Sequence, residues 1–163
     1  MKTKNKKKQF IRKREKPEFD QRLLDLARVT RVVKGGRRFR FRATMVIGNR
    51  KGKIGVGVAK GADVSDAINK AVNDAKKHLV EVNMWKTTIP HDIKVKLGSA
   101  KVMLRPVKEG RGIVAGGAMR MVVELAGIKD VVAKSLGTSN KLNVARATLL
   151  ALSRLEALEK NER

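Results

Sequence analysis

Residues 34–55, KGGRRFRFRATMVIGNRKGKIG, decide the first half of the fold. From Phe39 onward, apolar residues alternate with basic or polar ones, and this period of two predicts a half-buried strand. Residues 48–52, GNRKG, predict a turn, and the alternation over residues 54–58 predicts the second strand of an antiparallel hairpin. The positions expected to face the core are Phe39, Phe41, Ala43, Met45, Ile47, Ile54, Val56 and Val58, and those expected to face outward include Arg40, Arg42, Lys53, Gly55 and Gly57.

The charge of this stretch is one-sided, with eight basic residues and no acid. The whole chain has 39 Lys and Arg against 15 Asp and Glu, a formal net charge of +24. Such an excess repels itself unless a polyanion neutralises it, so nucleic acid, an anionic membrane surface or an acidic protein is the expected partner. Between Asp25 and Asp63 there is no acid, which makes the first half the main electrostatic contact.

Several classes of protein are disfavoured. No apolar run approaches the roughly 20 residues of a membrane span, and the basic N-terminus lacks the apolar stretch of a secretory signal; both fit a cytoplasmic protein. There is no cysteine, and the two histidines, His78 and His91, lack ligand spacing, so neither a metal nor another cofactor is expected. The acids are scattered without a paired set, which argues against an enzyme.

The organisation indicated is α+β, with two small lobes after a basic tail. Residues 1–18 are the tail, residues 19–83 read β-β-β-α, residues 84–158 read β-β-α-β-α, and residues 159–163 are a short C-terminal end. Helical spacing is present over residues 64–82 and 143–158, and a strand is expected over residues 131–136. Because a lobe of this size has a marginal core alone, the lobes are expected to pack on each other or on a partner.

A cationic surface with accessible backbone suits a lattice of phosphates. Arg40 and Arg42 are expected on one exposed strand face, and Gly35 and Gly36 let a ligand come close to the backbone. The residues predicted to bind RNA in the first lobe are Arg31, Lys34, Gly35, Gly36, Arg37, Arg38, Arg40, Arg42, Asn49, Arg50, Lys51, Lys53 and Lys60. In the second lobe they are Arg111 and a polar edge of Lys134, Ser135, Thr138, Ser139 and Asn140.

The kind of nucleic acid follows from the aromatic residues. The chain has no Tyr, four Phe and one Trp, and Phe39 and Phe41 are assigned to the core, so unpaired bases have little to stack on. Backbone and shape recognition of largely double-helical RNA is the better match. The polar residues Asn69, Lys70 and Asn73 of the first helix leave duplex DNA open.

Three motifs in order now indicate a family. VKGGRRFRF, GKIGVGVAKGADVSDAINKA and EGRGIVAGGAMRMVVELAGIKDVVAKSLGTSNKLNVARAT closely resemble the fifth protein of the small ribosomal subunit, bacterial type, over about residues 19–155. The resemblance implies a first lobe similar to double-stranded-RNA-binding domains and a second lobe with a left-handed β-α-β unit. It also implies binding to small-subunit rRNA, a role in assembly, and a place near the channel by which mRNA enters the subunit.

The resemblance carries further roles onto single motifs. The loop of Lys34, Gly35 and Gly36 looks like the one that reaches toward the head of the subunit, beside the spectinomycin site. Gly112 and Arg120 resemble positions where changes alter translational fidelity, at the contact with the fourth small-subunit protein. The third and eighth small-subunit proteins are the other neighbours implied.

Two other readings compete with a structural rRNA-binding protein. The first is a free RNA-binding regulator or RNA chaperone, which the charge alone would fit equally well. The second is an enzyme, since the fold expected for the second lobe also occurs in kinases and topoisomerases. Those enzymes need an ATP-binding loop, and the glycine pattern at Gly55, Gly57 and Gly61 has the wrong spacing for a dinucleotide fingerprint.

Overall fold

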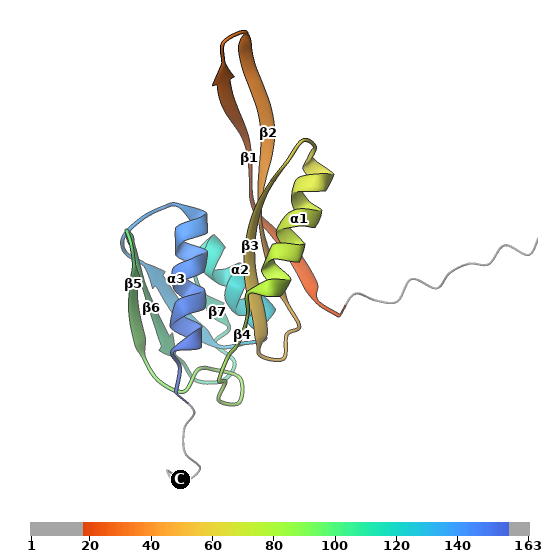
Figure 1. The fold of residues 1–163 in the computed structure, drawn as a ribbon. Helices are drawn as coiled ribbons and strands as arrows, with labels where there is room; N and C mark the ends of the chain where they lie inside the picture. The colour runs from red at the N-terminus through yellow and green to blue at the C-terminus, as the bar shows by residue number, and fades with distance from the viewer. Residues whose placement is uncertain (1–17, 157–163) are drawn as a thin grey trace, which may run out of the picture.

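Two sheets and three helices make up the part of the chain that the computed structural model describes, residues 18–156 (Figure 1). The expected α+β class and the two lobes are confirmed. The first lobe contains β1 (Asp20–Val33), β2 (Gly36–Gly48), β3 (Lys53–Gly61), α1 (Val64–Lys77) and β4 (Leu79–Glu81). The second contains β5 (Ile93–Leu97), β6 (Ala100–Pro106), β7 (Ile113–Val114), α2 (Gly117–Ala126), β8 (Val131–Ser135) and α3 (Lys141–Ser153).

The first sheet has the order β1-β2-β3-β4, and all its neighbouring strands are antiparallel. Helix α1 packs on β2 and β3 through small side chains, Ala67, Ala71 and Ala75. A Cβ at Gly57 would collide with the backbone carbonyl oxygen of Ala71. The outward orientation predicted for Gly55 and Gly57 is therefore wrong: both are buried, because the helix approaches so closely that only glycine fits beneath it.

The opposite face of this sheet is buried as well. Val46, Ile54 and Val56 belong to one hydrophobic cluster with Val122 and Leu125 of α2. The sheet is thus a shared wall, with α1 on one side and the second lobe on the other (Figure 1). The expectation that the lobes pack on each other is confirmed, and the exact domain boundaries stay a prediction.

The second sheet has the order β5-β6-β8-β7, and β7 runs parallel to β8. Helices α2 and α3 contact its inner face, where Val102, Leu104 and Val131 are buried. The helical spacing predicted over residues 64–82 is wrong at its end, because α1 stops at Lys77 and Leu79–Glu81 form β4. Strand β7 was not predicted, because a segment of two residues shows no periodicity.

Helix α3 begins and ends earlier than residues 143–158. Its N-cap is Asn140, whose side-chain oxygen accepts a hydrogen bond from the Leu142 amide at 3.1 Å. It ends at Ser153, and Leu155, expected on its inner face, is buried beyond that end. Leu158, predicted on the same face, lies outside the described residues, as do residues 1–17 of the predicted tail and the predicted C-terminal end.

Strands β1 and β2 continue well beyond the body of the molecule as a long hairpin (Figure 1). None of residues 28–41, which we call the hairpin arm, is buried. Phe39 was predicted to be core and is 46% exposed, so that assignment is wrong. The alternation fixed the face on which the ring lies, but α1 does not reach this far along the strand.

Within residues 18–156, the helices lack the length and apolar character that crossing a bilayer would need.

Candidate nucleic-acid interface

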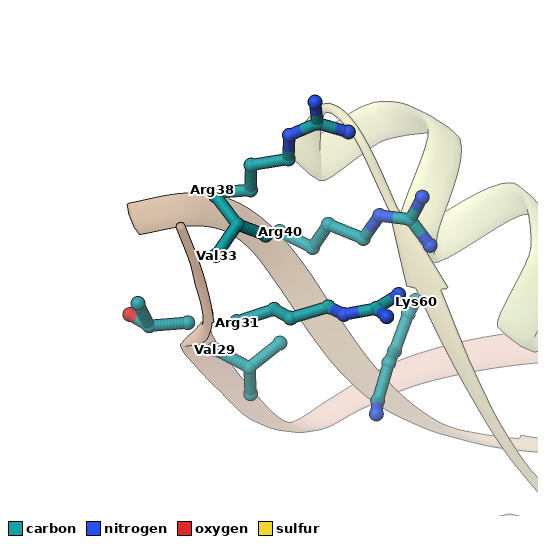
Figure 2. Close-up of a pocket in the computed structure, with 7 residues that line it drawn as sticks. Val29, Arg31, Val33, Arg38, Arg40 and Lys60 are labelled. Carbon is teal, nitrogen blue, oxygen red and sulfur yellow. The ribbon is translucent and has the colours of Figure 1, made fainter. Parts of the chain in front are cut away.

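The hairpin arm gathers cations on one face. The register pairs Arg31 with Arg38 and Val29 with Arg40 across β1 and β2, while Lys60 stands opposite Arg42 on the neighbouring strand β3. The side chains of Arg31, Arg38 and Arg40 extend side by side in the same direction (Figure 2). They line a pocket of about 470 Å³ together with Lys60, Val29, Thr30 and Val33.

These four cations have no acidic partner within the described residues 18–156. Like charges placed directly across two strands, as Arg31 and Arg38 are, destabilise the pair of strands. An anion with several oxygens would relieve this repulsion, and the planar guanidinium groups match phosphate geometry. The arm thus has the charge and the donor groups that a phosphate contact would require.

The tip of the arm leaves space for another molecule to come close to its backbone. Gly36 has φ +145°, a conformation that side chains rarely adopt, and the space around Gly35 and Gly36 is empty within 4 Å of where a Cβ would lie. Lys34 and Arg37 are exposed on either side of this turn. The predicted loop of Lys34, Gly35 and Gly36 thus presents backbone and charge together, at the point farthest from the body.

Arg42 differs from its neighbour Arg40, although both were predicted to be exposed. It is half-buried, and its guanidinium lies 3.9 Å from a carboxylate oxygen of Asp25. The other oxygen of Asp25 is 3.1 Å from the Lys141 ammonium of α3. Asp25 and Lys141 were not among the residues predicted from the sequence, because their pairing depends on how the two lobes pack. Asp25 therefore links the lobes through Lys141 and also holds Arg42, which is less exposed than predicted.

The turn between β2 and β3 is docked on α2. The side-chain oxygen of Asn49 accepts hydrogen bonds from the Lys51 and Lys53 amides at 2.8 and 3.0 Å. The Arg50 amide donates to the Leu125 carbonyl at 3.0 Å, and the Gly52 amide donates to the Ala126 carbonyl at 2.9 Å. The side chain of Asn49 is thus occupied in shaping the turn that holds the two lobes together.

Two of the three cations of this turn have acidic partners inside the chain. The Arg50 guanidinium lies 2.7 Å from Asp20, and the Lys53 ammonium lies 3.0 Å from Glu81. Lys51 forms no such pair within residues 18–156 and is exposed. The structure therefore separates this group from the acid-free cations of the arm at the other end of β2.

Gly112 and Arg120 come together around β7. The Gly112 amide donates to a carboxylate oxygen of Asp130 at 2.8 Å, and the Arg120 guanidinium donates to the Ile113 carbonyl at 3.2 Å. Hydrogen bonding by the Gly112 amide is the main cause that lowers the pKa of the buried Asp130 carboxyl below its ordinary value. A charged Asp130 thus pins the loop that carries the exposed Arg111.

Most polar groups at the predicted polar edge of the second lobe form hydrogen bonds within their own loop. The Ser135 hydroxyl donates to the Thr138 carbonyl at 3.3 Å, and the Thr138 hydroxyl accepts from the Asn140 amide at 3.2 Å. Asn140 caps α3. Ser139 and Lys134 remain exposed, and Lys134 lies on the outer face of the second sheet rather than in the loop.

Phe39 and Arg28 were missed as surface residues. The guanidinium carbon of Arg28 lies 3.7 Å from the centroid of the Phe39 ring, a cation–π contact on the α1 side of the arm. No sequence signal separated this exposed ring from a buried one. Within the described residues there is no group of three or more His, Cys, Asp or Glu that would hold a metal ion.

Both lobes match domains of a known protein family. The N-terminal domain of ribosomal protein S5 matches residues 19–83, and the C-terminal domain of ribosomal protein S5 matches residues 95–163. Proteins named "Small ribosomal subunit protein uS5" from three strains of Campylobacter jejuni are 52% identical over 146 residues. The match covers 90% of this chain and 99% of each relative.

Proposed function

This chain belongs to the ribosomal protein S5 family, and from that premise we propose that it holds its place in the small ribosomal subunit by binding small-subunit rRNA through the hairpin arm. It is a ribosomal protein of the cytoplasm and not an enzyme, as the sequence indicated. One observation carries the proposed contact: Arg31, Arg38, Arg40 and Lys60 share a face that lacks acidic partners within residues 18–156.

The rest of the predicted surface has unequal support. Lys34, Arg37 and Lys51 are exposed and suit phosphate contacts at the two ends of the first lobe. Arg50 and Lys53 reach RNA in addition to their internal partners, since exposed ion pairs are weak. Arg111, Lys134 and Ser139 are the accessible members of the second lobe.

The finer roles follow from this placement in the subunit. Binding of the arm to rRNA supports assembly, because it neutralises charge that otherwise repels itself. Gly112 and Arg120, which meet around β7, serve translational accuracy through a contact with the fourth small-subunit protein. The third and eighth proteins are the other neighbours, and basic side chains line the path by which mRNA enters.

Sedimentation tests the leading function against a free RNA-binding regulator or chaperone. The wild-type protein is expected to migrate with small subunits after a high-salt wash. The Arg38→Gln/Arg40→Gln variant is expected to stay at the top of the gradient. The charge-matched control is Arg146→Gln/Arg154→Gln, which removes two exposed cations on and just after α3 and should migrate like wild type. Free wild-type protein, or co-migration of both variants, would contradict the rRNA contact.

Salt dependence provides a second readout with purified components. If about 6–10 phosphates are neutralised, the affinity for rRNA should fall by about 10³–10⁵ between 50 and 200 mM salt, taking duplex DNA as the scale. A flat response would mean that phosphate contacts do not carry the binding.

A further inference from the structure

The second sheet has an uncovered face that is strongly basic. Lys94 and Lys96 of β5, Lys101 of β6 and Lys134 of β8 are exposed, while the residues that alternate with them pack on α2 and α3. Among these four, only Lys134 was part of the surface predicted from the sequence. The face lies on the second lobe, away from the hairpin arm (Figure 1).

The register places these lysines close together. Lys96 stands directly opposite Lys101, and Lys94 and Lys134 flank Met103 on the two sides of β6. Neighbouring strands are about 4.8 Å apart, and alternate residues of one strand are about 7 Å apart. The four ammonium groups therefore start from a patch about 10 Å across, which is two strand spacings.

Acidic partners for this patch are missing from the described part of the chain. Within residues 18–156 none of the four lysines has a carboxylate within ion-pair distance. The nearest internal pair on the sheet joins Arg105 to Asp92 at 3.2 Å. Directly opposed like charges, such as Lys96 and Lys101, weaken the pairing of their strands. A bound polyanion would turn this repulsion into attraction.

Protection of the sheet edge accounts for only part of this group of lysines. Lysines on an edge strand discourage pairing with other chains, and β5 is an edge of the sheet. That explains Lys94 and Lys96. It leaves Lys101 and Lys134 unexplained, because β6 and β8 are interior strands.

The composition of the face distinguishes RNA from a protein partner. Its strands contain no aromatic residue, and Met103 is the half-buried apolar side chain at the centre of the lysines. Protein interfaces are depleted of Lys and enriched in aromatic anchors, which does not describe this face. A flat set of ammonium groups without stacking residues suits the phosphate backbone of a double helix.

We propose that the outer face of the second sheet, built from Lys94, Lys96, Lys101 and Lys134, is a second RNA-binding surface that takes the phosphate backbone of an rRNA helix. This surface rests on the proposed function and extends it, because it gives the protein two separate contacts with rRNA, one on each lobe. The protein then bridges two rRNA segments, with the shared core between the lobes setting the distance between them.

The salt dependence of rRNA binding tests this surface with the full chain. The variant is Lys96→Gln/Lys101→Gln, and the charge-matched control is Arg146→Gln/Arg154→Gln. The probe is transcribed small-subunit rRNA, and circular dichroism checks the fold. Loss of two phosphate contacts should lower the slope of log affinity against log salt by about 2, on the duplex-DNA scale. The control should keep the wild-type slope, and an unchanged slope for the lysine variant would overturn the proposal.

A tethered probe identifies what covers the face. Since the chain has no cysteine, Met103→Cys provides one attachment point for an iron chelate that generates hydroxyl radicals. In reconstituted subunits without mRNA, strand cleavage within an rRNA helix is expected. Uncleaved rRNA, or cleavage of mRNA alone when mRNA is added in a second reaction, would overturn the proposal. Failure of wild-type protein to bind rRNA at all would remove the proposed function itself, so the two failures are distinguishable.

Discussion

The two halves of β2 have the same alternating pattern and opposite surroundings. Residues 43–48 are buried on both faces, one covered by α1 and the other by the second lobe. Residues 36–40 are exposed on both faces, because neither α1 nor the second lobe reaches them. A period of two reports which face a side chain takes, and whether that face is covered depends on the length of the elements packed against it.

The cations of the first lobe also differ between the body and the arm. Near the body, Arg42, Arg50 and Lys53 each have a carboxylate inside the chain. In the arm, Arg31, Arg38 and Arg40 have none within residues 18–156. These three pairs lie within the first lobe, so internal pairing distinguishes the cations near the body from those of the arm.

The substitution with the largest expected effect disrupts the buried part of the first sheet. Gly57→Ala places a methyl group against the backbone carbonyl of Ala71, and the clash should lower the free energy of unfolding by about 3 kcal/mol. Urea denaturation followed by circular dichroism measures it. The matched control is Gly35→Ala at the tip, where space is open, and its effect should stay within about 0.5 kcal/mol. Equal effects at the two glycines would contradict the contrast.

The sequence predicted the elements better than their surroundings. The hairpin, α1 and the second-lobe strands β5, β6 and β8 follow from periodicity, because burial of one face imposes it. The glycines under α1 were misplaced since glycine has no side chain to show a period. Phe39 was misplaced because the reach of α1 along the hairpin is a tertiary property.

The candidate site was predictable to a similar degree. The concentration of Arg and Lys around the arm is visible in the sequence, and the register keeps Arg38 and Arg40 together. The Arg42–Asp25 pair was not visible because it depends on how β1 and β2 pair, and the role of Asn49 was not visible because it depends on the local geometry of the turn.

A smaller effect concerns the loop that Asp130 pins. Amide hydrogen bonds, chiefly from Gly112, lower the pKa of this carboxyl in the folded state, so its stabilisation is present above the unfolded pKa of about 3.9 and is lost as pH falls through the folded value. Wild type should therefore be more stable than Asp130→Asn near pH 6, and the difference should shrink below about pH 4. Urea midpoints at the two pH values measure it. A difference that grows in acid would show the opposite sign of the pKa shift.

Removal of a helix cap should have a still smaller effect. Asn140→Ala removes the acceptor for the Leu142 amide and should lower the free energy of unfolding by about 1 kcal/mol. Asn140→Asp keeps an acceptor and serves as the control, with near-wild-type stability. If Asn140→Ala reduced RNA binding while stability stayed unchanged, Asn140 would act as an RNA-binding residue rather than as a helix cap.

The smallest effects on stability compare Arg40 and Arg42, neighbours on one face of β2. Arg42→Gln loses a partly buried pair with Asp25 and should lower the free energy of unfolding by about 0.2–1 kcal/mol, with the salt slope of rRNA binding unchanged. Arg40→Gln should leave stability unchanged and reduce that slope by about 1, because one phosphate contact is lost. Denaturation and filter binding on the same preparations measure both. Exchange of the two outcomes would mean that an internal carboxylate does not decide which cations bind RNA.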